Sequence, residues 1–364
     1  METLYDQFCS FENLYLAYRK ARKGKRGHAP AASFEFNQEK ELIELRDDLR
    51  GGTWQPGKYH NFYIHEPKRR LISAAPFRDR VVHHALCNLI EPDWERRFIF
   101  DTYANRKGKG THRAILRANE YAKRFKYVLQ CDVEQFFPSI DHALLRSQLA
   151  AHIEDESMIG VVDKILKSGE GVQTEEYEMR WFPGDDPSTG SGQGLFAALR
   201  PRGLPIGNLT SQFWANVYLC SFDHFVKREL RCKGYVRYVD DFLLFADNKE
   251  MLHDWAQKIV ARLSVLRLTL HEPQVYPVEN GIPFLGFTIF PDHRRLKRRR
   301  GIAFQRRFRH KYKNWLWGQI ERKKLDASAR SWAAHASWGQ TYGLRRAVLG
   351  QFDLSADPKG FQNL

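Results

Sequence analysis

Hydrophobic positions near the start of the chain repeat at helical spacing. Apolar side chains recur every three or four residues in 11–18 and again in 42–49, which predicts two helices. Between them, residues 19–26 hold six Lys or Arg in eight positions. Such a charge run is typical either of a solvated surface or of a phosphate contact, and the pattern leaves both open.

The pattern then changes to short β-prone runs. Residues 59–64 and 70–73 predict two strands, joined by a turn with a basic tip at 66–69. A helix is predicted from Arg78 to Leu89, where apolar positions return to helical spacing.

Two further β-prone runs carry acidic residues. Residues 127–133 (YVLQCDV) are apolar up to Asp132, which places this acid at the end of a predicted strand. Residues 236–245 (VRYVDDFLLF) predict a tight hairpin with Asp240 and Asp241 at its tip. An Asp-Asp pair alone is also typical of an ordinary turn. Placed side by side, the two elements would bring three carboxylates together, and such oxygen ligands hold Mg²⁺ with substrate phosphates.

Composition favours nucleic acid as the partner. The 364 residues are 43% hydrophobic, which is enough for a sizeable core, and the net charge is +15. An excess of Lys and Arg attracts a polyanion because neutralised phosphates release counterions. The five cysteines show no C-x-x-C spacing and no run is long enough to span a bilayer, so we expect a cytoplasmic protein without membrane contact.

The strongest positive charge lies near the C-terminus. Residues 294–313 hold eleven Lys or Arg and no acid. Phe304, Phe308, Tyr312 and Trp315 share one face of a predicted helix, which is typical of a helix core. The charges on the remaining surface predict contact with a phosphate backbone.

Taken together, the acidic motifs resemble those of the reverse transcriptase family. Residues 131–137 (CDVEQFF) look like the family's motif A, 203–212 (GLPIGNLTSQ) like motif B, and 238–241 (YVDD) like motif C. The resemblance implies an RNA-directed DNA polymerase that uses two Mg²⁺ ions, with Mn²⁺ as a possible substitute.

The resemblance extends beyond these three motifs. Residues 284–287 (FLGF) resemble the primer grip, and 68–80 resemble the fingers region that clasps the incoming triphosphate. The family's fold is α+β, a right-hand polymerase with fingers, a palm of antiparallel sheet plus helices, and a basic helical thumb. The resemblance divides this chain into a helical extension (1–55), fingers and palm (56–290) and thumb (291–364).

Roles for individual residues follow from the resemblance, supported by the charge pattern. The predicted catalytic and metal-binding residues are Asp132, Asp240 and Asp241, with the carbonyl of Val133 as a further metal ligand. The predicted nucleotide-binding residues are Lys68, Arg70, Arg80, Phe137, Ile206, Gly207 and Gln212, with Phe137 as the steric gate against a ribose 2′-hydroxyl. The predicted template-primer contacts are Arg106, Lys107, Lys109, Phe284, Leu285, Gly286, Arg298, Arg299 and Arg300.

Two residues differ from the pattern of the wider family and indicate which of its subgroups this chain resembles. Ile206 stands where group II intron enzymes carry Gln, and Gln212 stands where the family usually has Pro. Both features, and the segment 331–338 (SWAAHASW), resemble diversity-generating retroelement enzymes, which implies low-fidelity copying. Antiphage reverse transcriptases that act on their own noncoding RNA are the alternative, and a nonenzymatic maturase-like RNA-binding protein is a further one.

The implied partners follow from this setting. They are an RNA template, a DNA or RNA primer, deoxynucleoside triphosphates, a structured noncoding RNA and a small accessory protein.

Two other clusters imitate functional sites. Residues 184–186 (GDD) look like a polymerase metal motif, but no β-branched run flanks them, so a loop is predicted. His83, His84 and Cys87 could be metal ligands on one helix, but no second cluster accompanies them, so helix packing is predicted.

Overall fold

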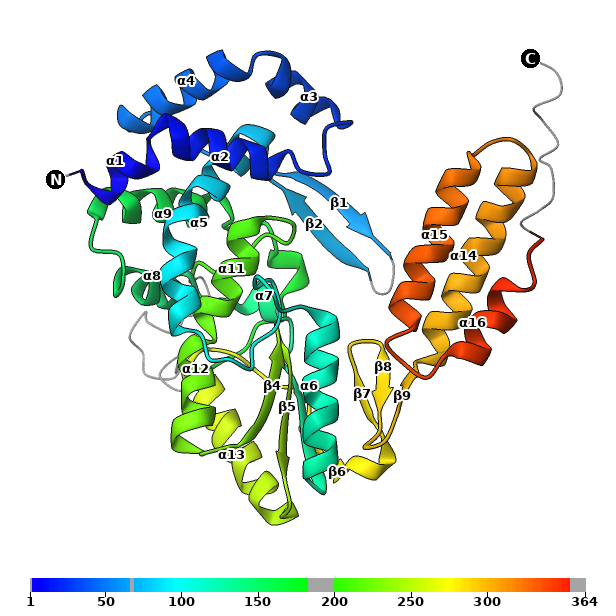
Figure 1. Ribbon diagram of the computed structural model, residues 1–364. Helices are drawn as coiled ribbons and strands as arrows, with labels where there is room; N and C mark the ends of the chain where they lie inside the picture. The colour runs from blue at the N-terminus through cyan, green and yellow to red at the C-terminus, as the bar shows by residue number, and fades with distance from the viewer. Residues whose placement is uncertain (1, 66–68, 183–199, 354–364) are drawn as a thin grey trace.

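The central element of the protein is a four-stranded antiparallel sheet (Figure 1). The computed structural model describes residues 2–65, 69–182 and 200–353. The strands lie in the order β4-β5-β3-β6, with bounds β3 Tyr127–Asp132, β4 Gly234–Tyr238, β5 Asp241–Ala246 and β6 Gln274–Pro277. Both predicted acid-bearing runs therefore belong to one sheet, and β3 pairs directly with β5.

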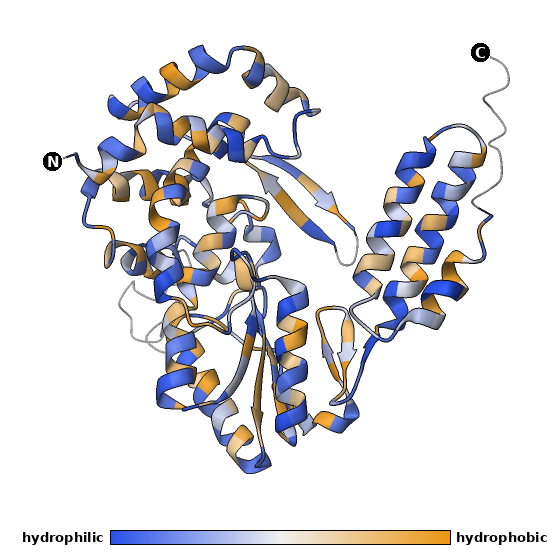
Figure 2. Ribbon diagram, in the orientation of Figure 1, coloured by the Kyte–Doolittle hydropathy of each residue, from blue (hydrophilic) through white to orange (hydrophobic). Residues whose placement is uncertain are grey.

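Alternate side chains of this sheet enter two different cores. On β5, Phe242 and Leu244 join one buried cluster, whereas Leu243 and Phe245 join a second cluster. Successive strand residues point to opposite faces, so a strand covered on both sides reads as a continuous apolar run. In Figure 2, β5 is coloured mainly as hydrophobic.

Amphipathic helices cover the two faces of the sheet. Helix α13, Lys249–Val265, buries Leu252, Trp255 and Ile259 in the first cluster. Helix α6, Thr111–Arg124, buries Ala114 and Ile115 in the second cluster. The helices that enlarge the first core are α7 Phe136–Ser139, α8 His142–Ala150, α9 Glu156–Ser168, α11 Leu209–Tyr218 and α12 Cys220–His224. Short helical turns at Thr174–Glu176 (3-10) and Phe225–Glu229 (π) extend this part of the chain.

The N-terminal part contains more helices than the two predicted. Its elements are α1 Leu4–Phe8, α2 Phe11–Ala21, α3 Ala29–Phe36, α4 Gln38–Arg50, the hairpin β1 His60–Ile64 with β2 Arg70–Ala74, and α5 Phe77–Arg97. Helix α2 packs on α5, where the Asn13 side chain donates to the Ala85 carbonyl. The predicted hairpin and the helix after it are confirmed.

The C-terminal part is a small sheet followed by three helices. Its elements are β7 Ile282–Phe284, β8 Phe287–Ile289, β9 Arg294–Leu296, a 3-10 turn Val278–Asn280 before them, and α14 Arg298–Leu316, α15 Arg322–Ala336 and α16 Tyr342–Leu349. Phe304 stacks on Trp332 with ring centroids 4.2 Å apart, so the predicted aromatic face of α14 forms a helix core. Because β9 pairs with β8, one sheet spans the predicted boundary between residues 290 and 291.

Membrane-spanning helices are absent from the described residues. None of the helices in these ranges combines the length and the apolar character needed to cross a bilayer. All five cysteines are buried and free.

Candidate active site

The hairpin β4–β5 carries two of the three predicted catalytic acids. Tyr238 pairs with Asp241, so Val239 and Asp240 form the two-residue turn. The prediction that both acids form the tip is therefore wrong, because Asp241 is already the first residue of β5. Val239 occupies the left-handed region at φ 60°, which is strained for a β-branched residue.

The third acid, Asp132, lies on the neighbouring strand. Asp132 on β3 is the register partner of Asp241 on β5. Directly opposite residues of an antiparallel pair share a face, with Cβ atoms about 4.5–5.5 Å apart. The backbone N–H of Val133 donates to the Asp240 carbonyl at 3.2 Å and ties the end of β3 to the turn. The structure thus brings all three predicted acids together at one end of the sheet.

Burial and repulsion from neighbouring carboxylates disfavour ionisation of Asp240 and Asp241. Burial, followed by the Asp132 carboxylate, raises the pKa of Asp240 to about 6. Burial, followed by Asp132 and Asp240, raises the pKa of Asp241 to about 8. The charge of Arg70 partly offsets the effect on Asp240, and the charge of Lys297 partly offsets that on Asp241. A cation placed among these carboxylates would relieve the repulsion.

The donor set fits a hard divalent cation. Three carboxylates supply only oxygen ligands, which Mg²⁺ prefers. The Oδ1 atom of Asp241 is buried and has no hydrogen-bond partner among the described residues. In residues 2–65, 69–182 and 200–353, no three His, Cys, Asp or Glu side chains already form a group positioned around one ion.

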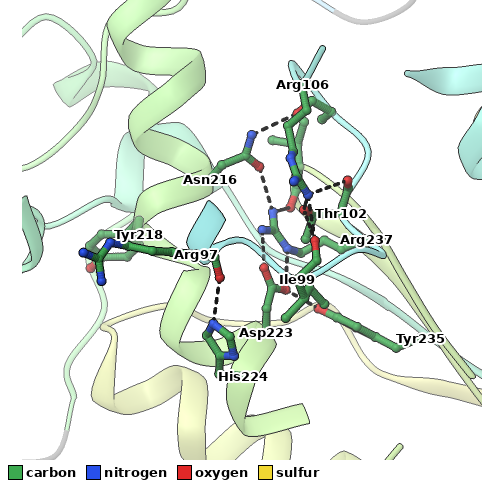
Figure 3. A network of polar contacts seen from close by, with 12 residues as sticks. Arg97, Ile99, Thr102, Arg106, Asn216, Tyr218, Asp223, His224, Tyr235 and Arg237 are labelled. Carbon is green, nitrogen blue, oxygen red and sulfur yellow. Dashed lines mark hydrogen bonds and ion pairs between the residues drawn. The ribbon is translucent and has the colours of Figure 1, made fainter. Parts of the chain in front are cut away.

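Arg237 belongs to a network of polar contacts that includes Asp223, Asn216 and Tyr235 (Figure 3). Arg237 is fully buried, and its guanidinium makes two hydrogen bonds to the Asp223 carboxylate, at 2.7 and 2.6 Å. Its Nη1 atom also donates to the Val239 carbonyl at 2.9 Å, in the turn next to Asp240. Burial alone would lower the pKa of Arg237, but Asp223 raises it overall, so the side chain stays charged. Arg237 therefore links the turn at Asp240 to a buried ion pair.

Sequence reasoning missed Arg237. The available signal was an arginine inside a run whose neighbours on both sides are apolar strand residues, since a charge there requires a buried partner. The partner Asp223 lies at the end of α12 and could not be paired with Arg237 from the sequence.

Two segments that carry predicted nucleotide-binding residues, β2 and the loop before α11, are joined by a backbone hydrogen bond. The Ser73 backbone N–H donates to the Ile206 carbonyl at 2.8 Å and joins β2 to this loop. Gly207 has φ 120°, and a Cβ atom there would lie 3.0 Å from Ile72 Cγ2, so both the conformation and the close approach require glycine. Phe137 joins the same region because its carbonyl accepts from the Leu204 N–H at 2.9 Å.

Comparison with known proteins identifies the family. The model of the family "Reverse transcriptase (RNA-dependent DNA polymerase)" matches residues 63–289, more than half of the chain and a range that includes all three acids. The chain belongs to the reverse transcriptase family.

Individual proteins are similar to this chain in sequence or in structure. Protein YkfC of Escherichia coli K12 is 25% identical over 301 residues, which are 71% of this chain and 72% of YkfC. The group II intron-encoded protein LtrA of Lactococcus lactis is 23% identical over 224 residues, and the match covers 60% of this chain and 33% of LtrA. Apo telomerase of Candida tropicalis is similar in structure, with a TM-score of 0.48 and 10% identity, over 80% of this chain and 59% of that chain.

Membership confirms the predicted fold class. The chain has the α+β, right-hand polymerase fold of reverse transcriptases, in which the sheet that carries the acids is the palm. Arg70 begins the second strand of the fingers hairpin. Gln212 lies in the first turns of α11, and the predicted triphosphate ligand Lys68 lies outside the described residues.

The surroundings of Arg106 do not fit its predicted role as a template-primer contact of this reverse transcriptase. Its side chain is only 6% exposed and pairs with Glu95 at 2.9 Å. Its Nη1 atom donates to the Ile99 carbonyl at 2.7 Å and to the Thr102 hydroxyl. The guanidinium is therefore occupied inside the protein and braces this loop, so we no longer assign it to the template. The neighbouring Lys107 is exposed, and the Lys109 ammonium lies over the Phe100 ring, 3.3 Å from its centroid.

The predicted primer grip and the basic helix lie next to each other. Leu285 and Gly286 form the β7–β8 turn, with φ 48° and 91°. The Gly286 carbonyl accepts from the Lys297 N–H at 3.0 Å, just before the first turn of α14. That turn presents three exposed arginines, Arg298, Arg299 and Arg300. The side chain of Phe284 is fully buried, which corrects its predicted contact, whereas Leu285 in the turn after it is half-buried.

The structure describes one of the two imitating clusters. Burial lowers the pKa of His83 to about 3, and Cys87 is buried beside it in α5, as the packing prediction expected. The described residues contain no metal-binding group of three or more ligands at this place. Residues 184–186 lie outside the described residues.

Proposed function

We propose that the chain is an RNA-directed DNA polymerase that extends a primer by two-metal-ion nucleotidyl transfer. One observation carries the proposal: Asp132 lies opposite Asp241 across β3–β5, with Asp240 in the adjoining turn. Three carboxylates that face a bound polyanion cost binding energy unless cations occupy the site.

In this proposal the three acids and the Val133 carbonyl hold two Mg²⁺ ions, for which Mn²⁺ can substitute. Bound ions of this kind activate a primer 3′-hydroxyl and stabilise the departing pyrophosphate. Val133 also keeps Asp240 in place through its N–H, and Arg237 holds the same turn through the Val239 carbonyl. Both contacts act on the backbone, so the turn is positioned before substrate arrives.

The fingers and the loop before α11 would hold the incoming nucleotide. Arg70 is close enough to Asp240 to lower its pKa, which supports a position beside the triphosphate. A guanidinium offers two parallel donors to phosphate oxygens, so Arg70 remains a proposed ligand, together with the ammonium of Lys68. Arg80 lines the cavity that also contains Lys25 and His83, so it is no longer proposed as a triphosphate ligand. Phe137 is proposed as the ring that excludes a ribose 2′-hydroxyl, and Gln212 is proposed as a further nucleotide contact.

The thumb side would hold the template-primer duplex. Lys297 partly offsets the repulsion at Asp241, so the start of α14 lies on the side of the acids. Arg298, Arg299 and Arg300 occupy a helix start where arginine is unfavourable without an anion, which supports contact with phosphates. Leu285 and Gly286 would meet the primer through the turn backbone, while Lys107 and Lys109 would contact the template.

The proposed biological setting is a diversity-generating retroelement in which copying is of low fidelity. Ile206 supports this setting, because an aliphatic side chain lacks the polar contact of Gln at that position. A defence enzyme that copies its own noncoding RNA is the alternative. Either setting implies a structured noncoding RNA and an accessory protein as partners.

Primer extension tests the proposed activity. Purified protein is given an RNA template, a DNA primer and deoxynucleotides, with Mg²⁺, with Mn²⁺ or with EDTA. We expect extension with either metal and none with EDTA. A protein that binds the template-primer but never extends it under any of these conditions would reject the enzyme and favour the nonenzymatic RNA-binding protein.

A further inference from the structure

A small cavity lies where the N-terminal extension, α5 and the start of α11 meet. Its volume is about 40 Å³, and its lining includes Lys25, Arg80, His83 and His84 together with Asn208 and Leu209. A cavity needs roughly 10–15 Å³ to admit one water molecule, so this one can hold a larger group. No acidic residue lines it.

His83 supplies an unpartnered donor to this cavity. The side chain is 2% exposed, and its Nδ1 atom has no hydrogen-bond partner among the described residues. Burial, followed by His84 and Arg80, lowers its pKa to about 3, so the imidazole is neutral at pH 7. A neutral imidazole has one N–H, which Nδ1 can carry and donate to an oxyanion. A buried polar atom without a partner is unfavourable unless a ligand or a water molecule forms a hydrogen bond with it.

The start of α11 adds backbone donors. The first N–H groups of a helix have no partner within the helix. The N-cap residue Asn208 does not cap α11, because its side chain bonds the Ala75 N–H and the Ser73 carbonyl instead. This ten-residue helix therefore presents uncapped N–H groups and the positive end of its dipole at the cavity.

The charges around the cavity all have the same sign. Arg80 uses Nε to donate to the Ala75 carbonyl, and its two terminal nitrogens have no acceptor among the described residues. Lys25 forms no ion pair within the same ranges, and burial and Arg80 lower its pKa. Burial, then Lys20, Lys25 and Arg80, lowers the pKa of His84 to about 4. An anion would compensate this uniform positive field.

We propose that this cavity binds one phosphate group, held by Lys25, Arg80 and His83 and by the first N–H groups of α11. A tetrahedral oxyanion matches both the volume and the donors that converge from three separate segments. The phosphate comes either from an RNA strand or from free inorganic phosphate. The RNA source rests on the proposed function, whereas phosphate binding itself does not.

The site would give the N-terminal extension a direct part in ligand binding. Lys25 precedes residue 63, where the match to the reverse transcriptase family begins. Gly207 also lines the cavity and belongs to the loop that joins the fingers strand β2. An occupied cavity would therefore connect residues 1–62 to the nucleotide-binding region through a single anion.

Binding of inorganic phosphate by the full chain tests the site. Lys25→Ala is compared with Lys23→Ala, which removes the same charge from the same segment at an exposed position that does not line the cavity. Isothermal titration calorimetry at constant ionic strength should give one site per chain in wild type and in Lys23→Ala. We expect Lys25→Ala to weaken binding by about tenfold, as loss of one charge-assisted contact does. Phosphate should also raise the pKa of His84 in an NMR titration.

Binding of a single-stranded RNA distinguishes the two sources. If the RNA backbone supplies the phosphate, Lys25→Ala lowers the slope of log affinity against log salt more than Lys23→Ala does. The difference between the two variants should correspond to the loss of about one phosphate contact. If the two variants bind RNA equally but differ in phosphate affinity, the ligand is free phosphate. Absence of phosphate binding in wild type, or equal phosphate affinity in both variants, overturns the proposal. Primer extension is measured on the same wild-type sample. If this protein does not extend a primer but Lys25→Ala still binds phosphate more weakly than Lys23→Ala, the proposed polymerase activity is rejected and the proposed phosphate site is supported.

Discussion

Variants of Arg237 should distinguish its contribution to folding stability from its contribution to the position of the turn at Asp240. Arg237→Met removes one partner of a buried ion pair and leaves the Asp223 carboxylate without a counter-charge. Removal of one partner from a buried pair costs roughly 3–5 kcal/mol. Tyr235 still donates to Asp223 at 2.8 Å, which places the expected loss at the lower end, about 3 kcal/mol. The free energy of unfolding, measured by urea titration, should fall by this amount.

A double variant isolates the contact to the catalytic turn. Arg237→Met with Asp223→Leu removes both buried charges, so most of the lost stability should return. The hydrogen bond to the Val239 carbonyl does not return, and Val239 then keeps its left-handed conformation without that support. Loss of a charged hydrogen bond of roughly 1.5–3 kcal/mol predicts primer extension slower by about ten- to 150-fold at unchanged RNA affinity.

Two outcomes would refute this reasoning. Wild-type stability of Arg237→Met would show that Asp223 is not left unpaired in a low-dielectric site. A double variant with both stability and full extension rate would show that the Val239 contact does not position Asp240. Asp254→Asn, an exposed acid paired with Lys258, serves as the control and should change neither quantity.

Three further substitutions test the proposed binding roles. Replacement of Arg298, Arg299 and Arg300 by Ala should flatten the slope of log affinity against log salt by up to about 0.9 per lost phosphate contact, and an unchanged slope would show that these charges are only solvated. Phe137→Ala should admit ribonucleotides in single-nucleotide incorporation, and unchanged discrimination would reject Phe137 as the gate. Ile206→Gln should lower the error rate of cDNA copied from one RNA template by about five- to 150-fold, because a polar contact contributes roughly 1–3 kcal/mol to discrimination. Equal error rates would shift weight to the defence setting.

The acidic site could be predicted because local patterns determine it. Asp132 ends an apolar run and Asp240 follows another. The two strands, β3 and β4, flank β5 and run in the same direction, so their acids lie at the same end of the sheet. The exact turn could not be predicted, since Val239 adopts a conformation that a β-branched residue disfavours on its own. Tertiary contacts impose it, including the hydrogen bond from Arg237.

Contacts between distant segments account for the remaining errors. Arg106 lies in a Gly- and Lys-rich loop that indicates phosphate contact, but its partner Glu95 sits on the preceding helix α5. The proposed phosphate cavity combines residues near positions 25, 80 and 208, and no local pattern joins them. Sequence periodicity identifies elements and faces, whereas partners far apart in the chain require the structure.

The most direct test of the account compares Asp240→Asn with wild type in primer extension on an RNA template at saturating Mg²⁺. Asn keeps the shape of the side chain and removes one charged ligand. Template affinity is measured in parallel and should stay within about twofold of wild type, because no phosphate contact is lost. The account predicts that extension falls below detection in Asp240→Asn and is unchanged in Asp254→Asn. Extension by Asp240→Asn at near the wild-type rate would contradict the assignment of these acids as the catalytic centre.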